Sequence, residues 1–146
     1  MKLKVGWIGR SKEPATQALT DEYVKRLGRF ISMETAVFKD EPSLLKLCTR
    51  DARPRYTLVL LDSRGKQFSS EEFATWLGVQ IEHSSQPLLF AVGPADGFTD
   101  HAKQSASLLL SLGKMTIAHE LARVVLLEQL YRAFTILKGH PYHSGH

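Results

Sequence analysis

The stretch Tyr56-Thr57-Leu58-Val59-Leu60-Leu61-Asp62 decides the fold class of this chain. It is almost entirely apolar and closes on a carboxylate, so a strand formed here has no polar face to turn toward water. Strands of this kind are typical of parallel sheets that are covered on both faces. The run Leu88-Leu89-Phe90-Ala91-Val92 has the same character. Together the two runs predict the centre of a mainly parallel β-sheet.

Outward from this centre, strand-like and helix-like segments alternate along the chain. Alternating or branched apolar patterns predict further strands at residues 2–8, 33–39 and 108–112. Apolar side chains at helical spacing predict helices at residues 14–30, 69–83 and 119–138, and shorter helices within 41–53 and from 99. This alternation predicts an α/β fold, with a mainly parallel sheet and helices on both faces, formed by one domain over residues 1–146.

The last predicted helix, at residues 119–138, is apolar on every side. Its apolar side chains project all round the helix axis: Leu121, Val124, Val125, Leu126, Leu127, Leu130, Phe134 and Leu137. A helix that is apolar all round is buried all round. Because a domain of this size has little cover of its own to offer, we expect a homodimer with this helix in the interface.

The composition is that of a soluble globular protein, with 43% hydrophobic and 23% charged residues. No apolar run approaches the roughly 20 residues that a membrane-spanning helix needs, which argues against a membrane protein. The single cysteine, Cys48, excludes an internal disulfide and fits the reducing cytoplasm. The net charge of +4 mildly favours a polyanionic partner such as RNA, DNA or a phospholipid.

Three loops follow apolar strands, and ligands of open α/β sheets bind beyond the carboxyl ends of the strands. These loops are residues 62–66, 93–98 and 113–119. Gly93 and Gly97 would allow a sharp turn or the close approach of a ligand, although for two glycines alone plain turn formation is the favoured interpretation. The chain lacks the glycine fingerprints of dinucleotide-binding and phosphate-binding loops, which leaves those two classes without support.

Charged residues of the last helix form two groups. His119 and Arg123 are one turn apart and share a face. A cation near the start of an apolar helix opposes the helix dipole, so we expect an anion, such as a phosphate or a carboxylate, to compensate Arg123. Glu128 and Arg132 are four residues apart, and a local ion pair is the favoured interpretation.

The end of the chain carries His140, His143 and His146 beside Tyr142. The histidine spacing could hold a metal, but no cysteine or acidic partner accompanies it, so we expect no metal site. Tyrosine can stack on a base, and histidine is the side chain best matched to proton transfer near neutral pH. Taken alone, these residues are better interpreted as a frayed tail.

Taken together, these segments resemble the ribosomal RNA large-subunit methyltransferase H family of the SPOUT class. The resemblance covers the whole chain and is densest between residues 93 and 143. It includes Leu60-Leu61-Asp62-Ser63-Arg64-Gly65-Lys66. Its most specific motifs are Lys114-Met115-Thr116, His119 with Arg123-Val124-Val125-Leu126-Leu127-Glu128-Gln129, Tyr131-Arg132-Ala133, and Pro141-Tyr142-His143.

The resemblance implies a fold and a cofactor that the patterns alone do not give. It implies a C-terminal segment threaded into a trefoil knot, which general fold rules would not propose. It also implies a homodimer and S-adenosylmethionine as methyl donor, without a metal. The cofactor pocket would be formed by Leu61, Gly93, Leu112, Gly113, Lys114, Met115, Thr116 and Ile117.

The implied substrate is N3 of a pseudouridine in 23S ribosomal RNA, modified within assembled ribosomes. His143 is the candidate base for the N3 proton, with Tyr142 holding the nucleotide, and water is the alternative base. Phosphate contacts, which would make binding salt-dependent, are expected from Arg10, Arg64, Arg123 and Arg132.

Three features depart from the family pattern. Gly93-Pro94 stands where family members have two glycines, and proline removes a backbone donor. The tail ends Ser144-Gly145-His146 where a basic residue commonly follows the histidine, and the region 41–54 is shorter than usual. Two alternatives therefore stay open: a SPOUT enzyme acting on another RNA such as tRNA, and a knotted RNA-binding protein without catalysis.

Overall fold

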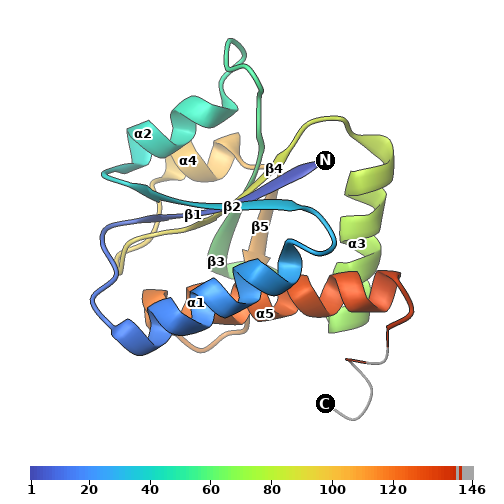
Figure 1. Cartoon of the computed structure of the whole chain (residues 1–146). Helices are drawn as coiled ribbons and strands as arrows, with labels where there is room; N and C mark the ends of the chain where they lie inside the picture. The colour runs from blue at the N-terminus through green and yellow to red at the C-terminus, as the bar shows by residue number, and fades with distance from the viewer. Residues whose placement is uncertain (141, 143–146) are drawn as a thin grey trace.

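The protein forms a five-stranded parallel sheet with helices on both faces (Figure 1). The computed structural model describes residues 1–140 and 142 of the 146. The strands are β1 (Lys2–Ile8), β2 (Ser32–Phe38), β3 (Thr57–Gln67), β4 (Leu88–Val92) and β5 (Leu108–Ser111). They are arranged in the order β2-β1-β4-β3-β5, and every neighbouring pair is parallel. The predicted α/β class and parallel sheet are confirmed.

The helices are α1 (Pro14–Leu27), α2 (Glu41–Leu45), α3 (Ser70–His83), α4 (Asp100–Ser105) and α5 (His119–Leu137). Helices α1, α3 and α5 pack on one face of the sheet, and α2 and α4 pack on the other (Figure 1). The short helix expected within 41–53 is present as α2, which is followed by a single 3-10 turn at Lys46–Cys48.

The start of α3 follows directly from its sequence. The Ser69 hydroxyl accepts a hydrogen bond from the N–H of Glu72 at 3.0 Å, and the Glu72 carboxylate accepts one from the N–H of Ser69 at 2.7 Å. This reciprocal capping satisfies two of the backbone donors that every helix leaves free at its N-terminus. The predicted N-terminus is therefore confirmed.

Strand β3 is longer than predicted. We expected it to end near Leu61 with a turn, whereas it continues to Gln67. The reason is strand β5, since Leu110 lies opposite Leu61 and again opposite Lys66, with an irregularity between the two pairings. A side chain on Gly65 would lie 2.4 Å from a backbone carbonyl oxygen of β5, so this close approach requires glycine.

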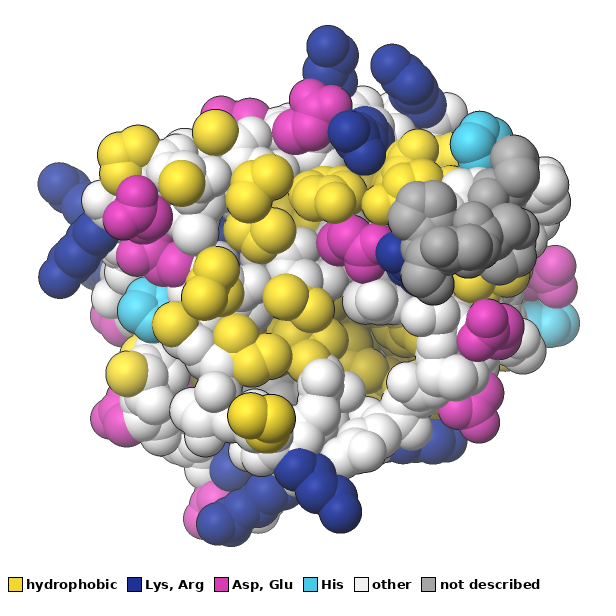
Figure 2. Space-filling view, turned by 90° about the horizontal axis from the view of Figure 1, so that it is seen from below, with side chains coloured by type: hydrophobic (Ala, Val, Ile, Leu, Met, Phe, Trp, Pro, Cys, Tyr) yellow, Lys and Arg dark blue, Asp and Glu magenta, His cyan; other side chains and the backbone are white. Residues whose placement is uncertain are grey.

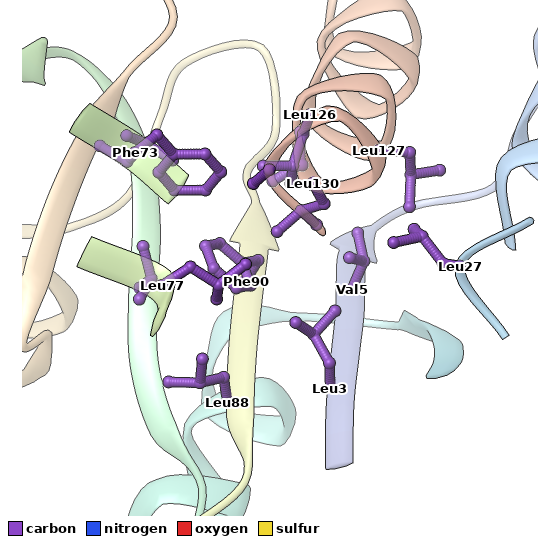
Figure 3. Close-up of a cluster of buried hydrophobic side chains, with 14 of the residues drawn as sticks. Leu3, Val5, Leu27, Phe73, Leu77, Leu88, Phe90, Leu126, Leu127 and Leu130 are labelled. Carbon is purple, nitrogen blue, oxygen red and sulfur yellow. The ribbon is translucent and has the colours of Figure 1, made fainter. Parts of the chain in front are cut away.

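The main core lies between the sheet and helices α1, α3 and α5. Figure 3 shows side chains of β1 and β4 meeting the leucines of α5 and the inner face of α3. Helix α5 lies at the centre of this layer, with Leu126, Leu127 and Leu130 all 0% exposed. Full burial of one leucine side chain contributes about 1.5–3 kcal/mol, so these three leucines together contribute roughly 4.5–9 kcal/mol to the docking of α5.

Candidate cofactor cavity and its surroundings

A cavity of about 700 Å³ lies at the carboxyl ends of β3, β4 and β5. Its volume is that of an ordinary small-molecule site, for which about 300–1,000 Å³ is typical. The walls come from the three loops that the sequence singled out, together with neighbouring residues of the strands and helices: Leu61, Val92, Lys103, Leu110, Leu112 and Ala122. Ligand sites are expected at this edge of an open α/β sheet.

Seven of the eight residues expected to hold the cofactor line this cavity. They are Leu61, Gly93, Leu112, Gly113, Met115, Thr116 and Ile117. The eighth, Lys114, is exposed beside them and is not part of the lining. The structure thus brings together residues that lie up to 56 positions apart in the sequence (61 to 117).

The buried hydroxyl of Ser111 joins two walls of the cavity. Its Oγ accepts a hydrogen bond from the N–H of Gly113 at 3.0 Å and lies 3.1 Å from the carbonyl oxygen of Ser63, to which it can donate. Gly113 has a φ of +138°, which side-chain-bearing residues rarely adopt. The turn after β5 therefore depends on a serine that sequence analysis did not single out and on a glycine that it did.

Close packing also explains Gly93. A side chain on this residue would lie 2.8 Å from the ring of Phe98, which is buried under the same loop. Pro94 also lines the cavity. The lack of a side chain on Gly93 therefore leaves room for the Phe98 ring, and Pro94 forms part of the cavity wall.

Asp62 and Lys103 place opposite charges on the cavity wall. The Asp62 carboxylate accepts a hydrogen bond from the N–H of Arg64 at 2.9 Å and pairs with Lys103 Nζ at 3.2 Å. The backbone N–H of Arg64, and then Lys103, hold the pKa of Asp62 below its ordinary value. The cavity thus offers an anionic and a cationic group to a polar ligand. In the sequence, the feature that points to Asp62 as a site residue is its position at the end of an apolar run.

Arg123 does not lie on the surface. Its side chain is 0% exposed, it donates from Nη1 to the hydroxyl of Ser11, and its guanidinium carbon lies 3.8 Å from the centre of the Trp7 ring. Burial lowers the pKa of Arg123. A direct phosphate contact would require the covering loop to move. Of the two anions that we expected, the carboxylate is present, because the charge of Glu120 acts against this lowering of the Arg123 pKa, while the direct contacts of Arg123 are a hydroxyl and an aromatic face.

The second predicted pair, Glu128 and Arg132, is an ion pair. Arg132 donates from Nε at 3.1 Å and from Nη2 at 2.5 Å to the same Glu128 oxygen, and both side chains are largely buried. Arg132 is therefore already engaged within the chain. The other two cations expected at phosphates, Arg10 and Arg64, are exposed, and Arg64 lines the cavity.

Tyr142 packs against the C-terminal half of α5. Its hydroxyl donates to Glu128 at 3.3 Å, and its ring meets the ring of Tyr131 edge-on at 4.7 Å between centroids. Burial chiefly raises the pKa of Tyr142 to about 12, which keeps the hydroxyl protonated. Tyr142 is not part of the cavity lining. The other expected tail residue, His143, lies outside the described residues.

Two further features, a metal-binding cluster and a membrane-spanning helix, are not found in the part of the chain that the structure describes. No group of three or more histidine, cysteine, aspartate or glutamate side chains could hold a metal ion. No helix there is long and apolar enough to cross a membrane.

Two solved structures share the fold. One is a probable methylase family protein from Haemophilus influenzae Rd KW20, with a TM-score of 0.59 at 8% identity over 98% of this chain and 70% of that chain. The other is the SpoU methyltransferase AviRb from Streptomyces viridochromogenes in complex with the cofactor AdoMet. Its TM-score is 0.55 at 14% identity, over 94% of this chain and 58% of that chain. At such identities the likeness bears on the fold alone.

Sequence relatives match over the full length. A ribosomal RNA large subunit methyltransferase H from Koribacter versatilis (strain Ellin345) is 56% identical over 146 residues, which is 100% of both chains. A protein of the same name from Geotalea daltonii (strain DSM 22248 / JCM 15807 / FRC-32) is 42% identical over 98% of this chain and 99% of its own. The family model described as "Predicted SPOUT methyltransferase" matches residues 1–143. The chain therefore belongs to the SPOUT methyltransferases, among the ribosomal RNA large subunit methyltransferase H proteins.

Proposed function

We propose that this chain is an S-adenosylmethionine-dependent methyltransferase that modifies N3 of a pseudouridine in 23S ribosomal RNA within assembled ribosomes. The observation that carries the proposal is the cavity at the carboxyl edge of the sheet, lined by the motif-bearing loops 93–98 and 112–119. The names of the full-length relatives support large-subunit ribosomal RNA as the substrate. The choice of nucleotide and of assembled ribosomes rests on the resemblance of the sequence motifs.

The cavity fits S-adenosylmethionine in size and in chemistry. Apolar side chains of Leu61, Leu112 and Ile117 line it and suit a flat adenine ring. Backbone N–H and C=O groups of residues 112–117 can pair with the edge of that ring. Asp62 and Lys103 offer a carboxylate and an ammonium group to the zwitterionic methionine end. This donor carries its own activated methyl group, so the proposal includes no metal.

The chain's own contribution to the reaction is alignment and proton removal. When bound, S-adenosylmethionine supplies a methyl group on a positively charged sulfur. The loops 93–98 and 112–117 would hold that group in line with the acceptor nitrogen, and such positioning can supply much of the rate. Tyr142 would hold the nucleotide, and His143 would take the N3 proton, with water as the alternative base.

We further propose that the active site is completed by a second subunit. Tyr142 contacts Glu128, which follows His119 of the cavity by nine residues, or roughly 13 Å along the helix axis. Because Tyr142 does not line the cavity of its own chain, we infer that it serves the cavity of a neighbouring subunit. The exposed side chains of Leu121 and Val125 on α5 support a dimer that packs through this helix.

The trefoil knot also belongs to the proposal. Strand β5 pairs with β3 both before and after residues 62–65, and a backbone group of β5 approaches Gly65 closely. This double pairing is compatible with a C-terminal segment that threads through the loop.

Two of the four candidate phosphate contacts remain in the proposal. Arg10 and Arg64 are exposed and can meet the ribosomal RNA backbone. Binding should then weaken as the salt concentration rises, because each neutralised phosphate releases counterions.

A labelled-methyl assay tests the activity and the substrate together. Intact ribosomes, free large subunits and tRNA are offered separately with labelled S-adenosylmethionine. The proposal expects label on the ribosomal RNA of intact ribosomes, at a pseudouridine. Label on tRNA alone would identify another RNA substrate. No heat of binding with millimolar S-adenosylmethionine would favour an RNA-binding protein without catalysis.

A further inference from the structure

The N-terminal end of α5 contacts two different parts of the molecule. His119 and Ala122 line the cofactor cavity, whereas Glu120 and Arg123 contact the loop of residues 9–13 that connects β1 to α1. This loop, which we call the basic loop, carries the exposed cations Arg10 and Lys12. One helical turn therefore separates a cofactor site from a pair of cations on the surface.

Glu120 holds the basic loop through its backbone. One carboxylate oxygen accepts hydrogen bonds from the N–H of Lys12 at 3.1 Å and of Glu13 at 3.3 Å, and from the hydroxyl of Thr16 at 3.2 Å. Glu13 is the N-cap of α1, so Glu120 supplies a negative charge where the dipole of that helix favours one. Three donors on one oxygen fix the loop relative to α5.

Arg123 holds the same loop from beneath. It donates to the hydroxyl of Ser11 and lies against the face of Trp7, while its Nε and Nη2 have no hydrogen-bond partner among the described residues. An apolar side chain would avoid the cost of burying a cation with two idle donors. What Arg123 provides that an apolar side chain would not is therefore a cation held beneath the basic loop.

We propose that Glu120 and Arg123 are positioning residues that set the basic loop beside the cofactor cavity, so that Arg10 and Lys12 meet the RNA backbone in a fixed arrangement. The inference rests on the proposed function, because it assumes an RNA partner. It gives α5 a second task besides lining the cavity. A loop that begins at Gly9, with a φ of +93°, would otherwise sample many conformations.

Glu120→Gln tests the proposal because the change in net charge and the loss of the loop's anchor predict opposite effects on RNA affinity. The substitution raises the net charge from +4 to +5, so electrostatics alone predicts tighter binding to RNA. Loss of the loop's anchor predicts weaker binding, by about fivefold, and a slope of log K against log salt that is shallower by about 1 to 2. The probes are intact ribosomes and, for comparison, large ribosomal subunits, titrated at several salt concentrations.

Asp21→Asn is the matched control. It makes the same charge change on the exposed side of α1, where Asp21 accepts only from Gln17 at 2.9 Å among the contacts described. It should bind RNA as tightly as the wild type or slightly more tightly. Ser11→Ala, which changes no charge, should weaken binding in the same direction as Glu120→Gln. Thermal unfolding of each variant checks that the fold is retained.

A double-mutant cycle separates positioning from a general structural effect. In the background Arg10→Gln with Lys12→Gln, Glu120→Gln should no longer weaken RNA binding, because the cations that it positions are gone. Wild-type-like or tighter binding by Glu120→Gln would overturn the inference and leave the methyltransferase proposal intact. No RNA binding by the wild type would overturn both, and the separate calorimetry with S-adenosylmethionine would still report on the cofactor site.

Discussion

Gly113 is the residue whose backbone most directly shapes the cavity. Its φ of +138° is accessible to glycine and strained for alanine, although nothing lies within 4 Å of the position that a side chain would take. Gly113→Ala should therefore lower stability by about 1–3 kcal/mol and weaken the binding of S-adenosylmethionine, measured by calorimetry.

Gly139→Ala provides the comparison for this prediction. Gly139 also has a positive φ, of +68°, but it follows α5 and does not line the cavity. It should lower the melting temperature without weakening cofactor binding. Equal cofactor affinity in the wild type and in Gly113→Ala would show that the turn after β5 is not part of the cofactor site.

His143 is the residue on which the proposed chemistry depends most. If it takes the N3 proton, His143→Ala should lower the rate of methyl transfer to ribosomes by about 100-fold or more, the usual scale of acid–base catalysis. Binding of S-adenosylmethionine should stay within about twofold of the wild type, since the proposed pocket does not include this residue. Full transfer activity in His143→Ala would leave water as the base.

At the scale of elements, Glu120 joins the N-termini of α1 and α5 in a pH-dependent way. The N–H of Glu13 chiefly holds the pKa of Glu120 below its usual value of 4.5. A depressed pKa in the folded state stabilises the protein fully above the unfolded value, and that contribution is lost as the pH falls through the folded value. The melting-temperature difference between the wild type and Glu120→Gln should therefore shrink as the pH falls below 4.5.

Circular dichroism during heating, at a series of pH values from neutral to acid, measures this difference. Asp21→Asn serves again as the variant with the same change of charge. A difference between the wild type and Glu120→Gln that persists unchanged into the acid range would mean that the carboxylate contributes nothing to holding the two helices.

The elements also show where sequence reasoning succeeds and where it stops. The apolar first half of β3, up to Leu61, and the capped start of α3 at Ser69 follow from local patterns, because their causes lie within a few residues. The burial of Arg123 depends on Ser11, which is 112 positions away, and the extension of β3 to Gln67 depends on β5. Contacts between residues so far apart leave no mark on the local sequence. Arg123 was therefore expected to contact a phosphate, and the segment after Leu61 was expected to form a turn.

At the scale of the whole molecule, an apolar surface supports the proposed dimer. Figure 2 shows hydrophobic side chains gathering on the side of the molecule where α1 and α5 lie in Figure 1. On α5, Leu121 is 52% exposed and Val125 is 37% exposed, although the opposite side of the helix, with Leu126, Leu127 and Leu130, is fully buried. Contiguous exposed apolar surface commonly marks an interaction site.

Leu121→Asp together with Val125→Asp should therefore give a monomer in light scattering and abolish methyl transfer to ribosomes. Burying two carboxylates in an apolar interface is strongly unfavourable, whereas an isolated chain would tolerate them at exposed positions. Val79→Asp, on an exposed position of α3, should remain a dimer with normal activity. A monomeric wild type at micromolar concentration would refute the dimer outright.

Helix α5 is at once the centre of the core and a wall of the cavity, so folding and ligand binding share one structural element. The cavity cannot form in a chain whose last helix has not yet docked. Any molecule that occupies the cavity consequently binds the folded state alone, and at a free concentration 100 times its dissociation constant it adds about 2.7 kcal/mol to the stability of the entire protein. The methyl donor would thus act as a folding ligand, and the abundance of the enzyme in a cell would follow the supply of its own cofactor.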